Sequence, residues 1–282
     1  MRFQVAFLLA MFALTATAQD KKRIFIITDG EGVAGICRQD QTPNTDPELR
    51  TLLTGEVNAA VEGFLEGGAD EVIVWDGHGG ANNLSATTIH PRAKLVMGGL
   101  NATITLERKY TAVAFVGQHA MANVQNAIMG HSYSSLGIQN MKVNGKNVGE
   151  IETRVAMAGH YGTPVIFLSG DRAAVEEMRA IVPDAEYAIV KEALSRYSCE
   201  TLSGEASRSL IAGKARASMA KIKTVKPYRI DGPVTLEIEY TTRNSLGPDA
   251  RLIPFAEVMD DRTIRYKGKD LIEAWGRYRT VR

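Results

Sequence analysis

The sequence lacks the features that mark several large classes of protein. It contains two cysteines among 282 residues, which excludes a disulfide-dense scaffold. Its formal net charge is +1, so no basic surplus favours binding to nucleic acid or to an acidic membrane surface. Hydrophobic residues make up 45% of the chain and charged residues 23%, as in ordinary globular proteins. The length suits one large α/β domain or two smaller ones that share a core.

Long apolar runs are also missing beyond the first eighteen residues, so we predict no contact with the membrane there. Within those eighteen, Arg2 gives a positive start, residues 5–13 are apolar, and Ala16-Thr17-Ala18 is typical of a cleavage site. We predict that residues 1–18 are a secretory signal peptide and that the mature chain begins near Gln19. The protein would then be exported, either periplasmic or secreted. An uncleaved N-terminal anchor is the alternative.

The two cysteines, Cys37 and Cys199, would meet an oxidising environment after export, where they could form a disulfide. They could equally be two unrelated buried thiols, since the sequence does not show whether their Cα atoms come close enough. Neither has another cysteine or a histidine at ligand spacing, which argues against a zinc site built on them.

Short β-rich apolar runs alternate with helical patterns along most of the chain. The predicted strands cover residues 23–28, 71–75, 111–117, 164–169 and 185–190. Helices are predicted at residues 48–66 and 171–181. Strands that alternate with helices imply parallel βαβ units and a doubly wound sheet.

Two regions break this alternation. Asn144-Gly145 lies between short apolar stretches and predicts a hairpin, followed by a helix over residues 150–160. The C-terminal part contains the predicted elements 203–221 (helix), 233–240 and 263–266 (strands) and 271–278 (helix). We therefore predict an α/β fold: a mostly parallel doubly wound sheet with an inserted hairpin and a smaller C-terminal α+β portion.

The corresponding domain prediction places an α/β metal-binding catalytic domain at residues 22–200. A C-terminal α+β portion at residues 201–282 would pack on it. A single continuous domain is the alternative.

Candidate functional residues collect where predicted strands end. In open α/β sheets, ligands bind beyond the carboxyl ends of the strands. Three histidines and four acids follow the first three strands and the hairpin: Asp29, Glu31, Asp76, His78, His119, His131 and Glu150. Zinc binds imidazole nitrogen and carboxylate oxygen, and such a set could hold two zinc ions with one bridging carboxylate. The alternatives are that Asp29 and Asp76 cap loops and that the histidines are structural.

A glycine-rich motif offers a competing interpretation. Gly30-Glu31-Gly32-Val33-Ala34-Gly35 matches the dinucleotide-binding pattern directly after a strand. However, Asp29 and Glu31 would place two carboxylates beside the phosphates, and prolines at positions 43 and 47 show that no helix opens after Gly35. We therefore reject nucleotide binding. The sequence also lacks the G-x-S-x-G and H-E-x-x-H motifs of serine hydrolases and ordinary zincins.

Taken together, these residues resemble a known family. The shared motifs, in order, are Asp29-Gly30-Glu31-Gly32, Asp76-Gly77-His78 with Asn82-Asn83-Leu84, His90-Pro91, Gly117-Gln118-His119-Ala120, Gly130-His131-Ser132, Val148-Gly149-Glu150 and Gly170-Asp171. This order and spacing resemble the zinc-dependent D-aminopeptidase family (DppA-like metallopeptidases) over nearly all of the mature chain. Each motif alone is weakly specific, whereas seven in order are strongly specific.

The resemblance implies a role for each site residue. Asp29 would bridge two Zn²⁺ ions per subunit, with Glu31 and His78 completing one site. His119 and Glu150 would complete the other site. His131 would stay off the metals and act in the chemistry. The resemblance also implies a homo-oligomer of ring shape.

Two further residues are candidates for supporting roles. Asp76 could accept a hydrogen bond that orients a ligand histidine. Asn82 could support the site in the same way or contact the substrate.

The function expected from this resemblance is hydrolysis of the N-terminal amide bond of short peptides, D-amino-acid peptides in particular, by a zinc-activated water. The partner would be the short peptide substrate, with no nucleic acid and no membrane after signal cleavage. The alternatives are a metal-dependent amidase or esterase acting on cell-wall fragments, and a non-catalytic exported metal- or peptide-binding protein. The known family members are cytoplasmic, so the export signal leaves the physiological substrate open.

Overall fold

A computed structural model describes residues 21–98, 105–247 and 249–280. The predicted signal peptide at residues 1–18 lies outside these ranges. Within them, no helix combines the length and the apolar character that crossing a membrane would require.

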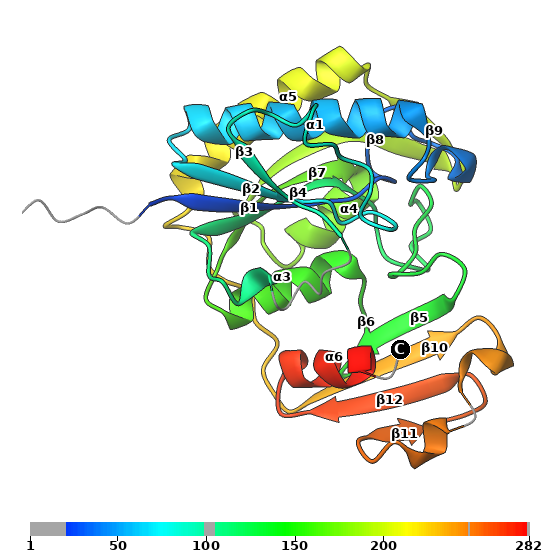
Figure 1. The fold of residues 1–282 in the computed structure, drawn as a ribbon. Coiled ribbons are helices and arrows are strands. Elements are labelled where there is room, and N and C mark those ends of the chain that lie inside the picture. The colour runs from blue at the N-terminus through cyan, green and yellow to red at the C-terminus, as the bar shows by residue number, and fades with distance from the viewer. Residues whose placement is uncertain (1–20, 99–104, 248, 281–282) are drawn as a thin grey trace, which may run out of the picture.

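The larger of two sheets has seven strands, and all of its neighbours pair in parallel except the last two (Figure 1). In spatial order they are β3 (Ala93–Val96), β2 (Glu71–Trp75), β1 (Arg23–Thr28), β4 (Ala112–Gln118), β7 (Val165–Asp171), β8 (Glu186–Ser195) and β9 (Ser198–Thr201). Every residue of β4 and β7 is buried, as expected of parallel strands covered on both faces.

Helices cover both faces of this sheet. One face carries α1 (Pro47–Glu66) and α5 (Gly204–Ser218), and the other carries α3 (Glu150–His160) and α4 (Arg172–Arg179) (Figure 1). The predicted doubly wound α/β fold is therefore confirmed. The start of α1 follows from its sequence, because the Asp46 side chain accepts a hydrogen bond from the Leu49 amide and a proline occupies the first helical position.

The smaller sheet is antiparallel and carries the helix α6 (Leu271–Thr280). Its strands, in spatial order, are β11 (Ala256–Val258), β12 (Thr263–Gly268), β10 (Val234–Tyr240), β5 (Ile138–Val143) and β6 (Lys146–Asn147). The predicted hairpin joins β5 and β6, and both turn residues have positive φ, 50° at Asn144 and 80° at Gly145, as a two-residue hairpin turn requires.

Elements from both sides of residue 200 are interleaved. The early hairpin pairs with β10, whereas the late helix α5 packs on α1. One continuous hydrophobic cluster contains Ile26 of the larger sheet and Leu236 of the smaller one. The domain boundary at residue 200 stays a prediction.

Three strands were not predicted from the sequence, namely β3, β9 and β11. They are short, three or four residues each, and most of their side chains are half-buried or exposed. Their sequences therefore carry neither the continuous apolar pattern of a buried strand nor a long alternation.

Candidate functional site

The ends of three adjacent strands bring the predicted residues together. Asp29 and Glu31 follow β1, His78 follows β2, and His119 follows β4, and these strands are neighbours in the order β2-β1-β4. Because the strands are parallel, their carboxyl ends meet at one edge of the sheet. Glu150 is the first residue of α3 and reaches the same place. All of these side chains are buried.

Asp29 lies at the centre of the cluster, with one carboxylate oxygen facing each side. Its Oδ1 lies 3.0 Å from Nδ1 of His78, and its Oδ2 lies 3.7 Å from Nε2 of His119. The same nitrogen of His78 lies 3.1 Å from Oε2 of Glu31. Nε2 of His119 lies 3.5 Å from Oε1 of Glu150. The cluster thus consists of two groups that share Asp29.

Each histidine is oriented by a backbone carbonyl. Nε2 of His78 lies 2.7 Å from the Thr42 carbonyl, Nδ1 of His119 lies 2.9 Å from that of Ala120, and Nδ1 of His131 lies 2.9 Å from that of Met129. A carbonyl oxygen only accepts hydrogen bonds, so each of these nitrogens carries the hydrogen. In the neutral ring, the other nitrogen then presents its lone pair to the carboxylates, which is how histidines that bind metals are held.

The donor atoms fit a metal ion better than they fit one another. Nε2 of His119 is buried and makes no hydrogen bond within the described part of the chain, although two carboxylates lie 3.5 and 3.7 Å away. Those distances exceed a good hydrogen bond. Ligand atoms of Asp29, Glu31 and His119 lie within 4.8 Å of one another, and so do those of His119, His131 and Glu150. The arrangement suits a cation between the groups.

The electrostatics of the cluster lead to the same conclusion. Burial lowers the pKa of His78, but the carboxylates of Glu31 and Asp29 outweigh it and raise that pKa to about 12. The pKa of His119 rises to about 10, because Glu150 and Asp29 overcome the effect of burial. Three buried carboxylates therefore draw positive charge into this place, and bound cations would supply it in place of protons on the histidines.

Arg154 supplies part of this positive charge. It lies one helical turn after Glu150, it is 4% exposed, and its Nη2 lies 2.8 Å from Oε2 of Glu150. Oε1 of the same carboxylate accepts a hydrogen bond of 2.9 Å from the Tyr133 amide. Glu150 is therefore held from both sides. Arg154 was not predicted from the sequence, although its position four residues after Glu150 places both on one face of a helix.

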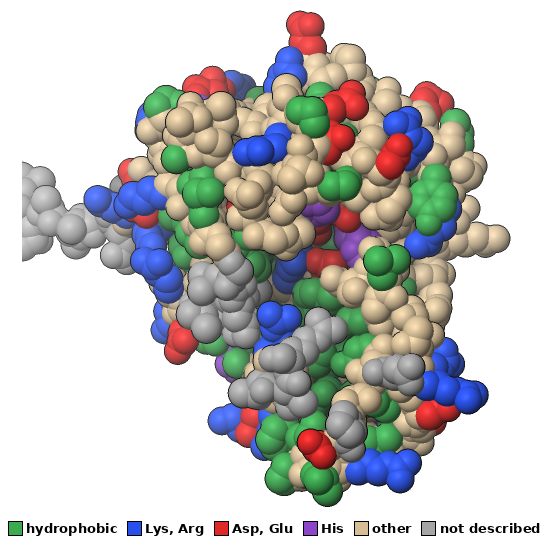
Figure 2. All heavy atoms as spheres, turned by 45° about the vertical axis from the view of Figure 1, so that its right-hand side comes forward, with side chains coloured by type: hydrophobic (Ala, Val, Ile, Leu, Met, Phe, Trp, Pro, Cys, Tyr) green, Lys and Arg blue, Asp and Glu red, His purple; other side chains and the backbone are tan. Residues whose placement is uncertain are grey.

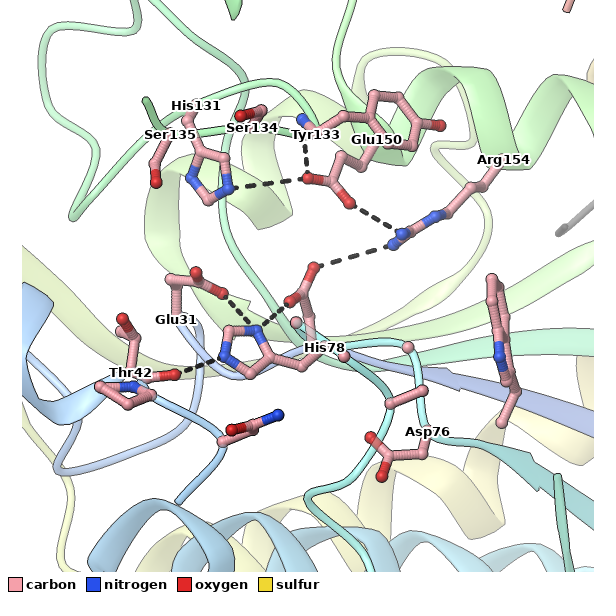
Figure 3. Close-up of a pocket in the computed structure, with 18 of the residues that line it drawn as sticks. Glu31, Thr42, Asp76, His78, His131, Tyr133, Ser134, Ser135, Glu150 and Arg154 are labelled. Carbon is pink, nitrogen blue, oxygen red and sulfur yellow. Dashed lines mark hydrogen bonds and ion pairs between the residues drawn. The ribbon is translucent and has the colours of Figure 1, made fainter. Parts of the chain in front are cut away.

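Asp76 and Asn82 differ from the other candidates. No dashed line joins the Asp76 carboxylate to the His78 ring, which contacts Glu31 and Thr42 instead (Figure 3). The carboxylate accepts hydrogen bonds from the Asn83 amide at 2.6 Å and the Leu84 amide at 2.9 Å. Asn83 in turn donates to the His78 carbonyl at 2.7 Å. Asp76 thus orders the backbone of the loop, and the Thr42 carbonyl orients the ring. Asn82 is exposed and lies outside the cavity lining, whereas Asn83 is buried.

The loop after β1 is held in place by distant residues. The buried ammonium of Lys191 donates to the carbonyls of Glu31, Val33 and Ile36. Gly32 lies so close to β4 that an added Cβ would stand 2.0 Å from the Gln118 carbonyl oxygen. Gly32 of the apparent nucleotide motif therefore serves close backbone packing, and the first α-helix after the motif begins only at Pro47.

Cys37 and Cys199 form a disulfide, with their Cα atoms 5.7 Å apart. The sequence left open a disulfide or two unrelated buried thiols, and the structure contains the disulfide. The bond ties the end of the β1 loop to β9. A cross-link between segments 162 residues apart restricts the unfolded chain and so stabilises the fold.

A cavity of about 650 Å³ opens above the cluster. Figure 2 shows a hollow on this face in which histidine and acidic side chains are visible. Asp29, Glu31, His78 and Glu150 form its floor together with His131, and the aromatic rings of Trp75, Tyr133 and Trp275 line it as well. This volume is in the range of small-molecule and short-peptide sites.

Comparison with known proteins identifies the family. The family model described as D-aminopeptidase matches residues 22–280. The chain belongs to the D-aminopeptidase family. A curated relative, the D-aminopeptidase of Bacillus subtilis (strain 168), is 27% identical over 260 residues, which cover 90% of this chain and 94% of that protein.

A solved structure of a D-aminopeptidase is also similar, with a TM-score of 0.83 and 26% sequence identity. It is described as the Zn-dependent D-aminopeptidase DppA from Bacillus subtilis, a self-compartmentalizing protease, and the match covers 92% of this chain and 96% of that one. The predicted resemblance, fold class and metal-dependent aminopeptidase function are therefore confirmed. The amidase or esterase and the non-catalytic binding protein are not favoured.

Proposed function

We propose that this member of the D-aminopeptidase family is a zinc enzyme that removes the N-terminal residue of short D-amino-acid peptides. The observation that carries the proposal is Asp29, whose two carboxylate oxygens face two histidine-containing groups at the floor of the cavity. The zinc dependence of the similar Bacillus subtilis structure supports the choice of metal.

We assign two zinc ions per subunit. Asp29, Glu31 and His78 would hold one ion, and Asp29, His119 and Glu150 would hold the other. The shared carboxylate and the two lone pairs that face it support this division. Arg154 and the Tyr133 amide each occupy one side of the Glu150 carboxylate and so keep its direction constant.

When bound, zinc supplies Lewis-acid activation of the scissile carbonyl and of water. The chain provides the rest of the chemistry. A zinc ion held by these residues would have an open position for the neutral amine of a peptide N terminus, which would account for action at that end. The His131 ring stacks on that of His119 with centroids 4.0 Å apart, and its Nδ1 is held by the Met129 carbonyl. His131 lines the cavity, and its Nε2, which lies 3.8 Å from Oε1 of Glu150, can give a proton to the leaving amine or take one from the attacking water.

Metal analysis combined with a peptide panel tests the proposal. We expect two zinc ions per purified chain and hydrolysis of D-alanyl dipeptides in preference to their L-alanyl counterparts. Removal of the metal with a chelator should abolish turnover, and added zinc should restore it. A zinc-loaded protein that hydrolyses neither series would overturn the proposal.

Replacement of His131 tests whether this residue transfers a proton or binds a metal ion. His131→Ala should keep both zinc ions and lower kcat by about 10²–10⁴-fold, the usual contribution of general acid–base catalysis. His160→Ala, at the exposed end of the same helix as Glu150, is the matched control and should retain full activity. Loss of a zinc ion from His131→Ala would instead make His131 a ligand, an assignment that its position beside His119 and Glu150 allows.

We also propose that the protein is exported and acts as a homo-oligomer with a ring-shaped assembly. The N-terminal signal pattern supports export, and so does the Cys37–Cys199 disulfide, because such bonds persist in oxidising compartments. The self-compartmentalizing character of the similar Bacillus subtilis protein supports the assembly.

A further inference from the structure

The cavity contains a second charged feature, which the proposed chemistry does not use. Arg279 lies near the end of α6, lines the cavity and is exposed. Within the described part of the chain it has neither an ion pair nor a hydrogen bond. A basic side chain that borders a substrate cavity without a protein partner is free to bind an anion.

Arg279 belongs to a continuous wall formed with two aromatic rings. It lies four residues after Trp275, so both occupy the same face of α6. The Trp275 ring contacts that of Tyr133, with centroids 4.8 Å apart. Tyr133 in turn lies next to the metal-binding floor, because its backbone amide donates a hydrogen bond to Glu150. We name Tyr133, Trp275 and Arg279 the α6 wall.

The charges of the cavity are therefore divided. Three carboxylates, Asp29, Glu31 and Glu150, lie on the floor, whereas Arg279 lies on the wall. Arg154, the other arginine among the described residues of the cavity lining, is already engaged by Glu150. In the proposed enzyme the floor carboxylates are taken up by zinc and the amino end of the peptide lies at the floor, so the carboxylate at the other end is left for the wall.

The length of such a peptide is compatible with this distribution. In a dipeptide, three bonds separate the scissile carbonyl carbon from the terminal carboxylate carbon, a span of about 4 Å at most. Each further residue adds about 3.5 Å. A cation on the wall of a cavity of about 650 Å³ can therefore meet the carboxylate only of a peptide of a few residues.

We infer that Arg279 binds the C-terminal carboxylate of the substrate, while Trp275 and Tyr133 pack against the residue that bears it. The enzyme then selects short peptides with a free C terminus. This inference rests on the proposed aminopeptidase function and names the substrate class of the same site.

Matched pairs of substrates test the inference. Each pair consists of a D-alanyl di- or tripeptide as the free acid and as the C-terminal amide. For the wild-type enzyme we expect kcat/KM for the acid to exceed that for the amide by about tenfold, mainly through KM, because the acid alone offers a charge-assisted bond. In Arg279→Gln this ratio should fall close to one. In Arg279→Lys, which keeps the positive charge, the ratio should lie between that of Arg279→Gln and that of the wild type.

The controls distinguish the ways in which the inference can fail. Arg251→Gln removes an exposed positive charge outside the cavity lining and should keep the wild-type ratio. Equal rates for acid and amide in the wild type, or an unchanged ratio in Arg279→Gln, would overturn the inference and leave the aminopeptidase function intact. Failure to hydrolyse either form would instead overturn the proposed function. Zinc content is measured for every variant, because an unequal metal load would change both substrates together.

Discussion

Behind the loop that carries Asp29 and Glu31 lies a small group of buried charges, of which Glu56 is the most informative. Its Oε1 accepts a hydrogen bond of 3.0 Å from the Ala34 amide. Burial raises the pKa of Glu56 from 4.5 to about 7, although the Ala34 amide and the ammonium of Lys191 oppose the rise. Burial likewise lowers the pKa of Lys191 to about 8. Both groups therefore titrate near neutral pH.

Glu56 makes stability depend on pH in a direction that can be measured. Because its folded-state pKa lies above the unfolded value, its favourable contribution is complete below about pH 4.5 and is lost as the pH rises through about 7. Glu56→Gln keeps the acceptor for Ala34 but cannot ionise. We expect the stability of the variant, relative to wild type, to rise between pH 5 and 7 by up to about 1.4 kcal/mol per pH unit.

Urea unfolding of the chelated proteins measures this difference without a contribution from zinc release. Glu66→Gln, which changes an exposed glutamate of the same helix, is the control and should follow the wild-type curve. If the free energies of unfolding of wild type and Glu56→Gln changed with pH in the same way, the prediction would be contradicted.

At the level of single residues, the sequence was sufficient to predict a site residue where a metal-binding side chain directly follows a predicted strand. An acid or histidine directly after a parallel strand has to lie at the sheet edge, which is why Asp29, His78 and His119 were found. It was insufficient for Asn83, which differs from Asn82 only in the direction of its side chain. That direction depends on the turn that the Asp76 carboxylate holds together.

Among the secondary-structure elements, the contact between α1 and α5 depends on one small residue. An added Cβ on Gly63 of α1 would stand 2.3 Å from the Ala212 carbonyl oxygen of α5 and 3.0 Å from the Cβ of Ala215. The two helices therefore pack with their backbones unusually close. They lie side by side over one face of the larger sheet (Figure 1).

This close approach predicts opposite effects for two glycine substitutions. Gly63→Ala gains helix propensity of about 1 kcal/mol, but it forces the helices apart. We expect a net loss of about 1–3 kcal/mol in the free energy of unfolding. Gly213→Ala on α5, where an added Cβ meets nothing within 4 Å, should be neutral or slightly stabilising. Urea unfolding compares them, and an equally stable Gly63→Ala would show that the helices adjust freely.

The elements themselves differ in how well their sequences revealed them. Long buried strands and long helices have clear hydrophobic patterns, and they were predicted with bounds that differ from the structure by a few residues. For example, the fifth strand was expected to stop at residue 190 but continues to Ser195. Its last residues are largely exposed and pair only with the polar edge strand β9. Such a segment is ordered by its neighbour and not by an apolar pattern of its own.

For the whole molecule, the two sheets share one core, and both contribute to the cavity. The strand ends of the larger sheet and the start of α3 supply most of the floor, and α6, which packs on the smaller sheet, supplies Trp275 and Arg279. The substrate would therefore lie between two parts of the chain that meet only in the folded molecule. The disulfide acts at the same scale, because it joins the loop after β1 to β9.

The proposed export makes a prediction about the N terminus and the cysteines of the protein. We expect the exported chain to begin near Gln19 and to take up no thiol label until it is reduced, when Cys37 and Cys199 should each take up one. Intact mass measurement before and after reduction gives both results. A chain that lacks residues 1–18 and stays in the cytoplasm is the control and should present two free thiols. A full-length chain with two free thiols in the native host would contradict export.

The sequence by itself determined which residues could bind metal, because the order of strands along the chain places their following acids and histidines at one edge. It also carried the family motifs and the doubly wound α/β class. The tertiary structure decided what surrounds them: the Thr42 carbonyl on His78, the Lys191 ammonium under the β1 loop, the disulfide, and Arg279 on the wall of the cavity. These contacts join residues far apart in the chain, and no local period or motif encodes such a meeting.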